Sequence, residues 1–127
     1  MRGYRLGFGL MVTALVVPPL HAADGDMSVA TFLEKADKLK KKGAFALLSS
    51  DMKVLKREAT ASGAAYRAKL KADKEAGRTP HSCPPEKGAL NSDELLAHYQ
   101  SYPASQRSRV TVRQGFFDLM KKRYPCE

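Results

Sequence analysis

Two cysteines, Cys83 and Cys126, constrain the fold of this chain more than any other feature of its sequence. Each stands beside proline, which fixes its own backbone and has no amide hydrogen, so both thiols are expected on connectors rather than inside helices. If the two cysteines pair, the bridge closes a long loop and stabilises the fold by about 4 kcal/mol in the chain-entropy model. For a small domain that is a large share of the total stability. We therefore predict a disulfide that ties the tail of the chain to its middle.

Residues 1–22 have the pattern of a secretory signal peptide. A basic start precedes the apolar run 6–17, prolines interrupt that run, and Ala22 offers a small residue for cleavage. The run is too short for a permanent membrane span, which needs about 20 apolar residues. The alternative, a buried N-terminal helix of a cytosolic protein, has no amphipathic pattern after it to pack against. We predict a signal peptide over 1–22 and one periplasmic or secreted domain over 23–127, in a compartment where disulfides form.

The chain is basic, with 22 lysines and arginines against 13 acidic residues. Loss of a signal peptide would remove two of the arginines and leave the domain still clearly basic. Such a charge favours an acidic protein partner, anionic envelope polymers or phospholipid headgroups, and it also serves solubility. Nucleic acid is a poor partner for an exported chain, and the lysines are scattered among acids rather than gathered in a phosphate-binding stripe.

Apolar residues recur at spacings of three and four in the first half of the domain and predict two helices. The first helix follows Ser28, a suitable N-cap, and ends at Gly43. The second is longer, because it starts near Asp51 after a Ser50 cap and runs to about Ala76. Between the two helices lies a short apolar patch made of Phe45, Leu47 and Leu48.

Two further helices are expected after the first cysteine. Asn91 and Glu94 form a capping-box pattern, and the helix that they start ends at Tyr102. The last helix is expected from Arg109 to Arg123, so that the β-branched cluster at positions 110–112 falls inside a helical period and no strand is predicted. The expected fold is all-α, a small bundle of about four helices stapled by one disulfide.

Residues that commonly carry catalysis are few. After loss of the signal peptide only His81 and His98 remain as histidines, and no Gly-x-Ser-x-Gly elbow accompanies them. A zinc site would have to recruit both histidines and both cysteines, whereas a disulfide is the more usual fate of two cysteines in an exported chain. Glycine-rich phosphate loops are missing from the sequence as well. We expect a protein that is not an enzyme and that has no cofactor and no metal.

The C-terminal half resembles the Rap/Tai family of immunity proteins. The residues that carry the resemblance are Cys83-Pro84-Pro85, Ser92-Asp93-Glu94-Leu95-Leu96, Tyr99, Tyr102-Pro103, Phe117, Met120 and Tyr124-Pro125-Cys126. The resemblance implies an exported helical protein that protects a bacterium from type VI secretion effectors, typically cell-wall amidases, by plugging them in the periplasm. These residues are mainly scaffold and argue for the fold more than for the activity. The chain departs from the family because it has no further cysteines and because residues 62–66 match the family's Gly-Tyr motif only weakly.

An immunity function implies stoichiometric binding of an exported hydrolase, with a rigid loop or helix end closing its cleft. The candidate partner-binding residues are exposed cations near the proline-braced connectors, namely Arg78, His81, Arg107, Arg109 and Arg113. Solvated surface charge is the simpler interpretation of each one. A periplasmic holdase chaperone is an alternative, although the chain has no histidine cluster to sense acid. A binder of anionic envelope components is another, with weak contact to such a surface, and the oligomeric state stays open.

Overall fold

A computed structural model describes residues 23–88 and 90–127. The predicted signal peptide therefore lies outside the described residues. The described chain forms four α-helices and one 3₁₀ helix, in the order α1 (Val29–Lys42), η1 (Gly43–Leu48), α2 (Ser50–Glu75), α3 (Ser92–Ser101) and α4 (Val112–Arg123). The prediction of an all-α fold with four helices is confirmed. None of the described helices combines the length and apolar character needed to cross a membrane.

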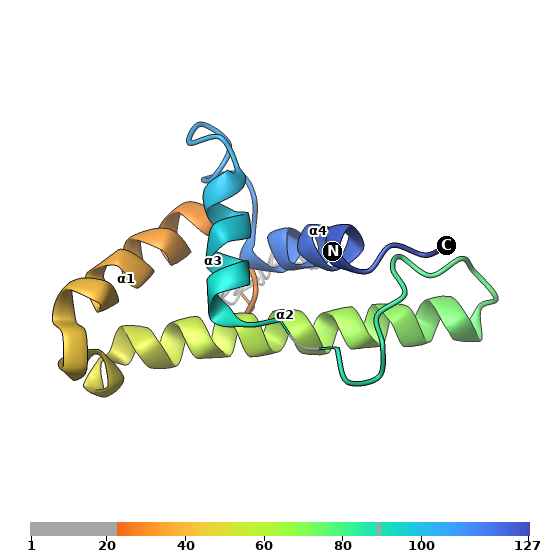
Figure 1. Cartoon of the computed structure of the whole chain (residues 1–127), viewed down its shortest axis with the longest axis horizontal. Coiled ribbons are helices and arrows are strands. Elements are labelled where there is room, and N and C mark those ends of the chain that lie inside the picture. The colour runs from red at the N-terminus through yellow and green to blue at the C-terminus, as the bar shows by residue number, and fades with distance from the viewer. Residues whose placement is uncertain (1–22, 89) are drawn as a thin grey trace, which may run out of the picture.

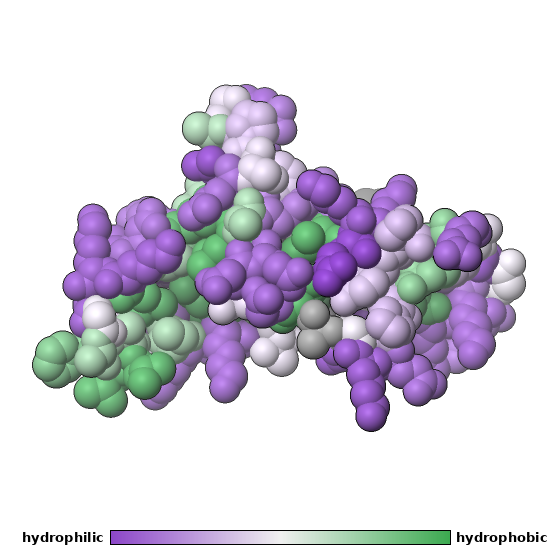
Figure 2. Space-filling view, in the orientation of Figure 1, coloured by the Kyte–Doolittle hydropathy of each residue, from purple (hydrophilic) through white to green (hydrophobic). Residues whose placement is uncertain are grey.

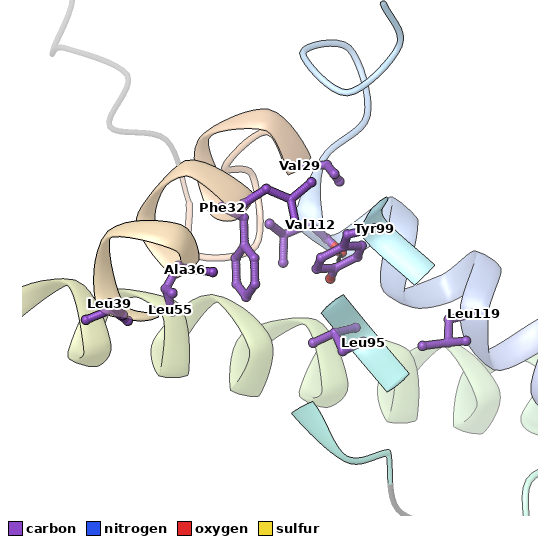
Figure 3. Close-up of a cluster of buried hydrophobic side chains, with 10 residues drawn as sticks. Val29, Phe32, Ala36, Leu39, Leu55, Leu95, Tyr99, Val112 and Leu119 are labelled. Atoms are coloured by element: carbon purple, nitrogen blue, oxygen red, sulfur yellow. Dashed lines mark hydrogen bonds between the residues drawn. The ribbon is translucent and has the colours of Figure 1, made fainter. Parts of the chain in front are cut away.

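The long helix α2 forms the base on which α1, η1 and α4 pack (Figure 1). Helix α1 lies against the N-terminal half of α2 and α4 against the C-terminal half, while α3 contacts both α1 and α4. The main hydrophobic core occupies the junction of the four helices (Figure 3). At its centre the rings of Phe32 and Tyr99 meet edge to face at 5.2 Å, and the Tyr99 hydroxyl donates to the carbonyl oxygen of Val112. The core thus joins elements that are far apart in the sequence.

The predicted capping residues hold the helix ends. Ser28 accepts from the Thr31 amide at the start of α1, and the capping box of Asn91 and Glu94 is complete at α3. The N-cap of α2 is Ser49, one residue before the expected Ser50. Local side-chain chemistry therefore predicts the ends of these helices to within a residue.

The start of the last helix differs from the prediction, because α4 begins at Val112 rather than Arg109. The Val110 carbonyl accepts from the Val29 amide at 2.8 Å, the Val112 amide donates to the Met27 carbonyl at 2.7 Å, and Ser28 and Thr111 form an isolated antiparallel bridge. These contacts hold the backbone extended at Thr111, which then caps the helix. The β-branched cluster at 110–112 was thus wrongly placed inside a helical period, since pairing with a distant segment determines its conformation.

The predicted disulfide between Cys83 and Cys126 is confirmed, with an S–S distance of 1.99 Å and a Cα–Cα distance of 5.0 Å. Beside it, the Cys83 amide donates to the carbonyl oxygen of Tyr124 at 2.8 Å. The bridge fastens the chain after α4 to the connector between α2 and α3. It therefore closes the end of the molecule where α2 and α4 run side by side (Figure 1).

Candidate binding surfaces

The outer face of α2 carries a shallow groove with a volume of about 450 Å³. We call it the α2 groove, and the residues that line it are Lys53, Lys56, Arg57, Thr60, Ala61 and Ala64. Spacings of three and four residues place these side chains on one face of the helix. The cations stand toward the N-terminal part of the groove, and small side chains continue it along the helix. The groove therefore offers close access to a helix backbone beside a concentration of positive charge.

The charges of the α2 groove differ in how they are engaged. Arg57 pairs with Asp24 at 3.0 Å, and both side chains are largely exposed. Among the described residues neither Lys53 nor Lys56 forms an ion pair, and both are exposed. Two lysines are thus available to acidic groups of a partner, and attraction of this kind acts mainly on the rate and specificity of association.

A second surface is the apolar tip, which we define as Phe45, Leu47 and Leu48 of η1. Their exposed fractions are 75%, 76% and 83%, although large hydrophobic residues of folded proteins are usually buried. Figure 2 shows hydrophobic side chains gathered at the end of the molecule where α1 turns into α2. Contiguous exposed apolar groups of this kind mark contact sites more often than solitary ones do.

The backbone of η1 is held in place although its large side chains are not buried. Ala46 packs partly against the core, and its carbonyl oxygen accepts from the Ser49 amide at 3.0 Å. Ser49 is itself buried and receives a hydrogen bond from Lys42. Gly43 begins the turn with a φ of 55°, a conformation that glycine adopts without strain. The three apolar side chains of the tip are therefore exposed on a turn whose backbone is held by hydrogen bonds.

Two of the sequence-predicted partner residues lie near the disulfide and have internal contacts. Arg78 donates to the buried carboxylate of Asp73 at 3.1 Å, and Lys69 pairs with the same carboxylate at 3.4 Å. Burial works to raise the pKa of Asp73, but the hydrogen bond from Arg78 and the charge of Lys69 outweigh it and lower that pKa. Arg78 thus secures the end of α2, even though much of its side chain is exposed.

His81 lies against Tyr66 of α2, with 3.1 Å between its Nδ1 and the phenol oxygen. The same phenol hydrogen-bonds the buried hydroxyl of Ser82, and Phe117 of α4 packs on the Tyr66 ring at 4.9 Å between centroids. Burial lowers the pKa of His81, and the nearby Lys121 lowers it further. This cluster fixes the connector that carries Cys83 onto α2 and α4.

The other three candidates lie elsewhere in the fold. Arg107 donates to the carbonyl oxygens of Tyr102 and Gln100 at the C-terminal end of α3, at 2.9 and 2.6 Å. Arg113 of α4 holds the segment before α1 through the Asp24 carbonyl and the Asp26 carboxylate, while its Nε is buried without a partner among the described residues. Arg109 is exposed. The five candidates thus belong to three separate parts of the structure.

Sequence reasoning missed a buried carboxylate on α2. Glu58 is 6% exposed and accepts from the amides of Gly25 and Met27 at 2.7 and 3.3 Å. It anchors the segment before α1, which Arg113 also holds. The available signal was its position, since Glu58 lies between Leu55 and Ser62 on the buried stripe of α2. The α2 groove was missed as well.

The remaining histidine also takes part in an interhelical contact. His98 Nε2 lies 3.2 Å from the Tyr102 hydroxyl, which donates to the Asp118 carboxylate at 2.6 Å. Burial lowers the pKa of His98, and burial together with Asp118 raises the pKa of Tyr102. The neighbouring Ser101 hydroxyl donates to the His98 carbonyl oxygen. The chain of contacts joins α3 to α4, and within the described ranges no cluster of three or more potential metal ligands is found.

No family model, curated protein or solved structure matches the chain in comparisons with known proteins. The α2 groove and the apolar tip are the two surfaces on which functional proposals can be built. They differ in chemistry, because the groove combines cations with small side chains and the tip consists of large apolar side chains.

Proposed function

We propose that this protein is an exported, non-enzymatic binding protein that neutralises a bacterial cell-wall hydrolase, of the type VI secretion amidase class that the resemblance implies. The observation that carries the proposal is the α2 groove, with Lys53 and Lys56 available for acidic groups. An acidic segment beside the cleft of the hydrolase is the partner surface that this groove fits. Binding there covers the cleft and blocks substrate entry without any chemical step.

The small residues of the α2 groove favour close approach by a partner. Ala61 and Ala64 leave the helix backbone near the surface, so that a partner helix or strand can pack closely against it. Lys53 and Lys56 would then meet acidic side chains at the edge of the contact, where complementary charge speeds association. Each element of this surface lies on a single helix, which simplifies recognition.

Rigidity of the base helix also supports an inhibitory role. Helix α2 extends over 26 residues and packs against α1 on one part of its length and α4 on another. The disulfide and the contacts of Tyr66 hold the C-terminal part in place. A surface that is already ordered loses little conformational entropy on binding, which is the property expected of a tight stoichiometric inhibitor.

The test is inhibition of peptidoglycan amidases by the purified, oxidised protein. A panel of type VI amidase effectors is assayed on cell-wall fragments with increasing amounts of the protein, and complexes are detected by size-exclusion chromatography. We expect stoichiometric loss of activity for at least one amidase. Failure to bind or inhibit any amidase in the panel would contradict the proposal.

Charge reversal locates the contact. The double variant Lys53→Glu/Lys56→Glu should weaken inhibition by about tenfold or more, because acidic partner groups then face like charges. Lys71→Glu/Lys74→Glu is the matched control, since both lysines are exposed on the same helix outside the α2 groove and the pair has the same spacing and charge change as Lys53 and Lys56. Equal inhibition by the groove variant and the control variant would place the contact elsewhere on the protein.

A holdase chaperone is the second candidate, favoured by the exposure of the apolar tip. A holdase suppresses aggregation of unrelated unfolding proteins, and the tip offers the apolar groups that such clients recognise. Light scattering of a client at neutral and acid pH distinguishes the two functions. Suppression without amidase inhibition would support the holdase, and amidase inhibition without suppression would exclude it.

A further inference from the structure

We propose that the apolar tip and the adjoining lysines form a contact site for the surface of an anionic phospholipid bilayer. The site comprises the apolar tip and a lysine flank, which we define as Lys40, Lys41 and Lys42 at the end of α1. This proposal goes beyond hydrolase binding, because it concerns a different surface and a different class of partner. It depends on the exposure and charge of these six residues.

The apolar part of the site is solvent-exposed to an unusual degree. Each of its three side chains is at least 75% exposed, and they occur within four consecutive residues of one turn. Helix η1 has no buried residue, so none of these side chains is needed to complete the core. Large apolar groups on a braced turn can enter the boundary between headgroups and acyl chains without any rearrangement of the fold.

Positive charge is concentrated beside the tip. Lys40, Lys41 and Lys42 are consecutive and exposed, and among the described residues Lys40 and Lys41 form no ion pair. Two acidic residues lie near the flank, namely Asp37, one helical turn before Lys40 and Lys41, and Asp51, which pairs with Lys35 at 2.8 Å. The three lysines of the flank outnumber these acids, so its net charge is positive. A cluster of lysines next to apolar side chains is complementary to the negative headgroups of phosphatidylglycerol and similar lipids.

Shape and position favour a bilayer over a second copy of the chain. The tip projects from the end of the molecule where α1 turns into α2, whereas the C-terminus lies toward the opposite end (Figures 1 and 2). A symmetric contact between two tips would bring two lysine flanks together, and like charges at that distance repel. At a lipid surface the apolar side chains can instead enter the acyl-chain boundary while the lysines contact the anionic headgroups. The opposite end of the fold then stays in water.

The chain has no tryptophan, so Phe45→Trp introduces a single fluorescent reporter at the tip. The full chain is expressed, and the oxidised variant is purified and mixed with vesicles of phosphatidylcholine and phosphatidylglycerol in equal parts. We expect a blue shift of the emission and quenching by brominated acyl chains. Pure phosphatidylcholine vesicles should produce neither effect at the same lipid concentration. An emission that stays at its water-exposed wavelength with the anionic vesicles overturns the proposal.

Vesicle sedimentation of unlabelled variants separates insertion from general charge attraction. Phe45→Ser/Leu47→Ser/Leu48→Ser should reduce binding to the anionic vesicles by about tenfold or more, since three apolar groups no longer enter the interface. Lys40→Gln/Lys41→Gln should reduce binding by about 25-fold, because each lysine near an anionic surface contributes roughly fivefold. Binding of the triple serine variant at the level of the unmodified protein overturns the proposal.

The matched control is Lys121→Gln/Lys122→Gln at the end of α4, which lowers the net charge equally at exposed positions away from the tip. It should bind the vesicles within about twofold of the unmodified protein, and a loss equal to that of the flank variant overturns the proposal.

Sedimentation velocity without lipid tests whether a second copy of the chain occupies the tip instead of a bilayer. A dimer that the triple serine variant abolishes shows a second copy on the tip and also overturns the proposal. Amidase inhibition is measured on the same variants, so that this proposal and the proposed function can fail separately.

Discussion

The two ends of the molecule differ in whether their side chains contact one another or are exposed to solvent. At the disulfide end, polar side chains of α2 and the following connector bond one another, and the residues concerned are Tyr66, Asp73, Arg78, His81, Ser82, Cys83 and Cys126. At the other end, η1 presents Phe45, Leu47 and Leu48 to solvent. The difference indicates that the first end stabilises the fold, while the second contributes little to stability and is available for contact with something else.

The largest expected effect comes from removing the disulfide. Cys83→Ser/Cys126→Ser should lower the free energy of unfolding by about 4 kcal/mol, because the unfolded chain regains the freedom of a long loop. Urea denaturation followed by circular dichroism measures the loss. The unmodified protein with intact disulfide is the reference, and an unchanged urea midpoint would show that the disulfide end does not stabilise the fold as proposed.

A matched pair of leucines compares a buried position on α2 with an exposed position at the tip. Leu55 is 8% exposed on α2 and Leu48 is 83% exposed at the tip. Leu55→Ala should cost about 3 kcal/mol through lost burial and the cavity left behind. Leu48→Ala should change the free energy of unfolding by less than about 0.5 kcal/mol. Thermal and urea denaturation of both variants test this, and a large loss for Leu48→Ala would mean that the tip supports the core.

Tyr66→Phe tests the hydrogen bonds of the disulfide end. The buried phenol contacts His81 and Ser82, and its removal leaves the Ser82 hydroxyl without this partner. We expect a loss of about 1–3 kcal/mol with little change in the structure of the ring packing. Urea denaturation measures the loss, and Tyr124→Phe is the control because this ring lies outside the cluster. Similar stability of the two variants would contradict the stabilising role of the cluster.

The smallest expected effect is a dependence of stability on pH. Burial lowers the pKa of His81 and of His98 below the ordinary 6.5, so the unfolded chain binds protons more readily than the folded one. Stability should therefore fall as the pH drops through 6.5 toward the lower folded-state pKa values. Thermal unfolding between neutral and mildly acid pH measures a shift of a few degrees. His81→Phe and His98→Phe should each reduce the slope, and an unchanged slope in both would contradict this origin.

Local chemistry predicted a large part of the fold. Ser28, Asn91 and Glu94 cap helices where the sequence places them, since a cap depends on residues within one turn of each other. The pairing of Cys83 with Cys126 was also accessible, because no other cysteine competes for either one. The apolar spacings predicted which elements are helical, and the hydrogen bonds of a helix are likewise local.

The candidate surfaces were less accessible to prediction. Phe45, Leu47 and Leu48 were visible as an apolar patch, but hydrophobic residues in a short connector are ordinarily expected to pack against neighbouring helices. Their exposure depends on how α1 and α2 diverge from η1, which no local pattern encodes. The α2 groove depends equally on the absence of a covering helix on that face of α2 in the described residues.

The amino-acid sequence thus accounts for the helices, their caps and the disulfide. The helices and caps depend on neighbouring residues, and two cysteines can form only one disulfide within the chain. Packing between distant segments accounts for the extended backbone at Thr111, the burial of Glu58 and the exposure of the apolar tip. Each of these depends on which partner surface is present in space. Burial and pairing are properties of the assembled core, so the linear pattern could place Glu58 on the buried stripe of α2 but could not show which distant segments these residues meet.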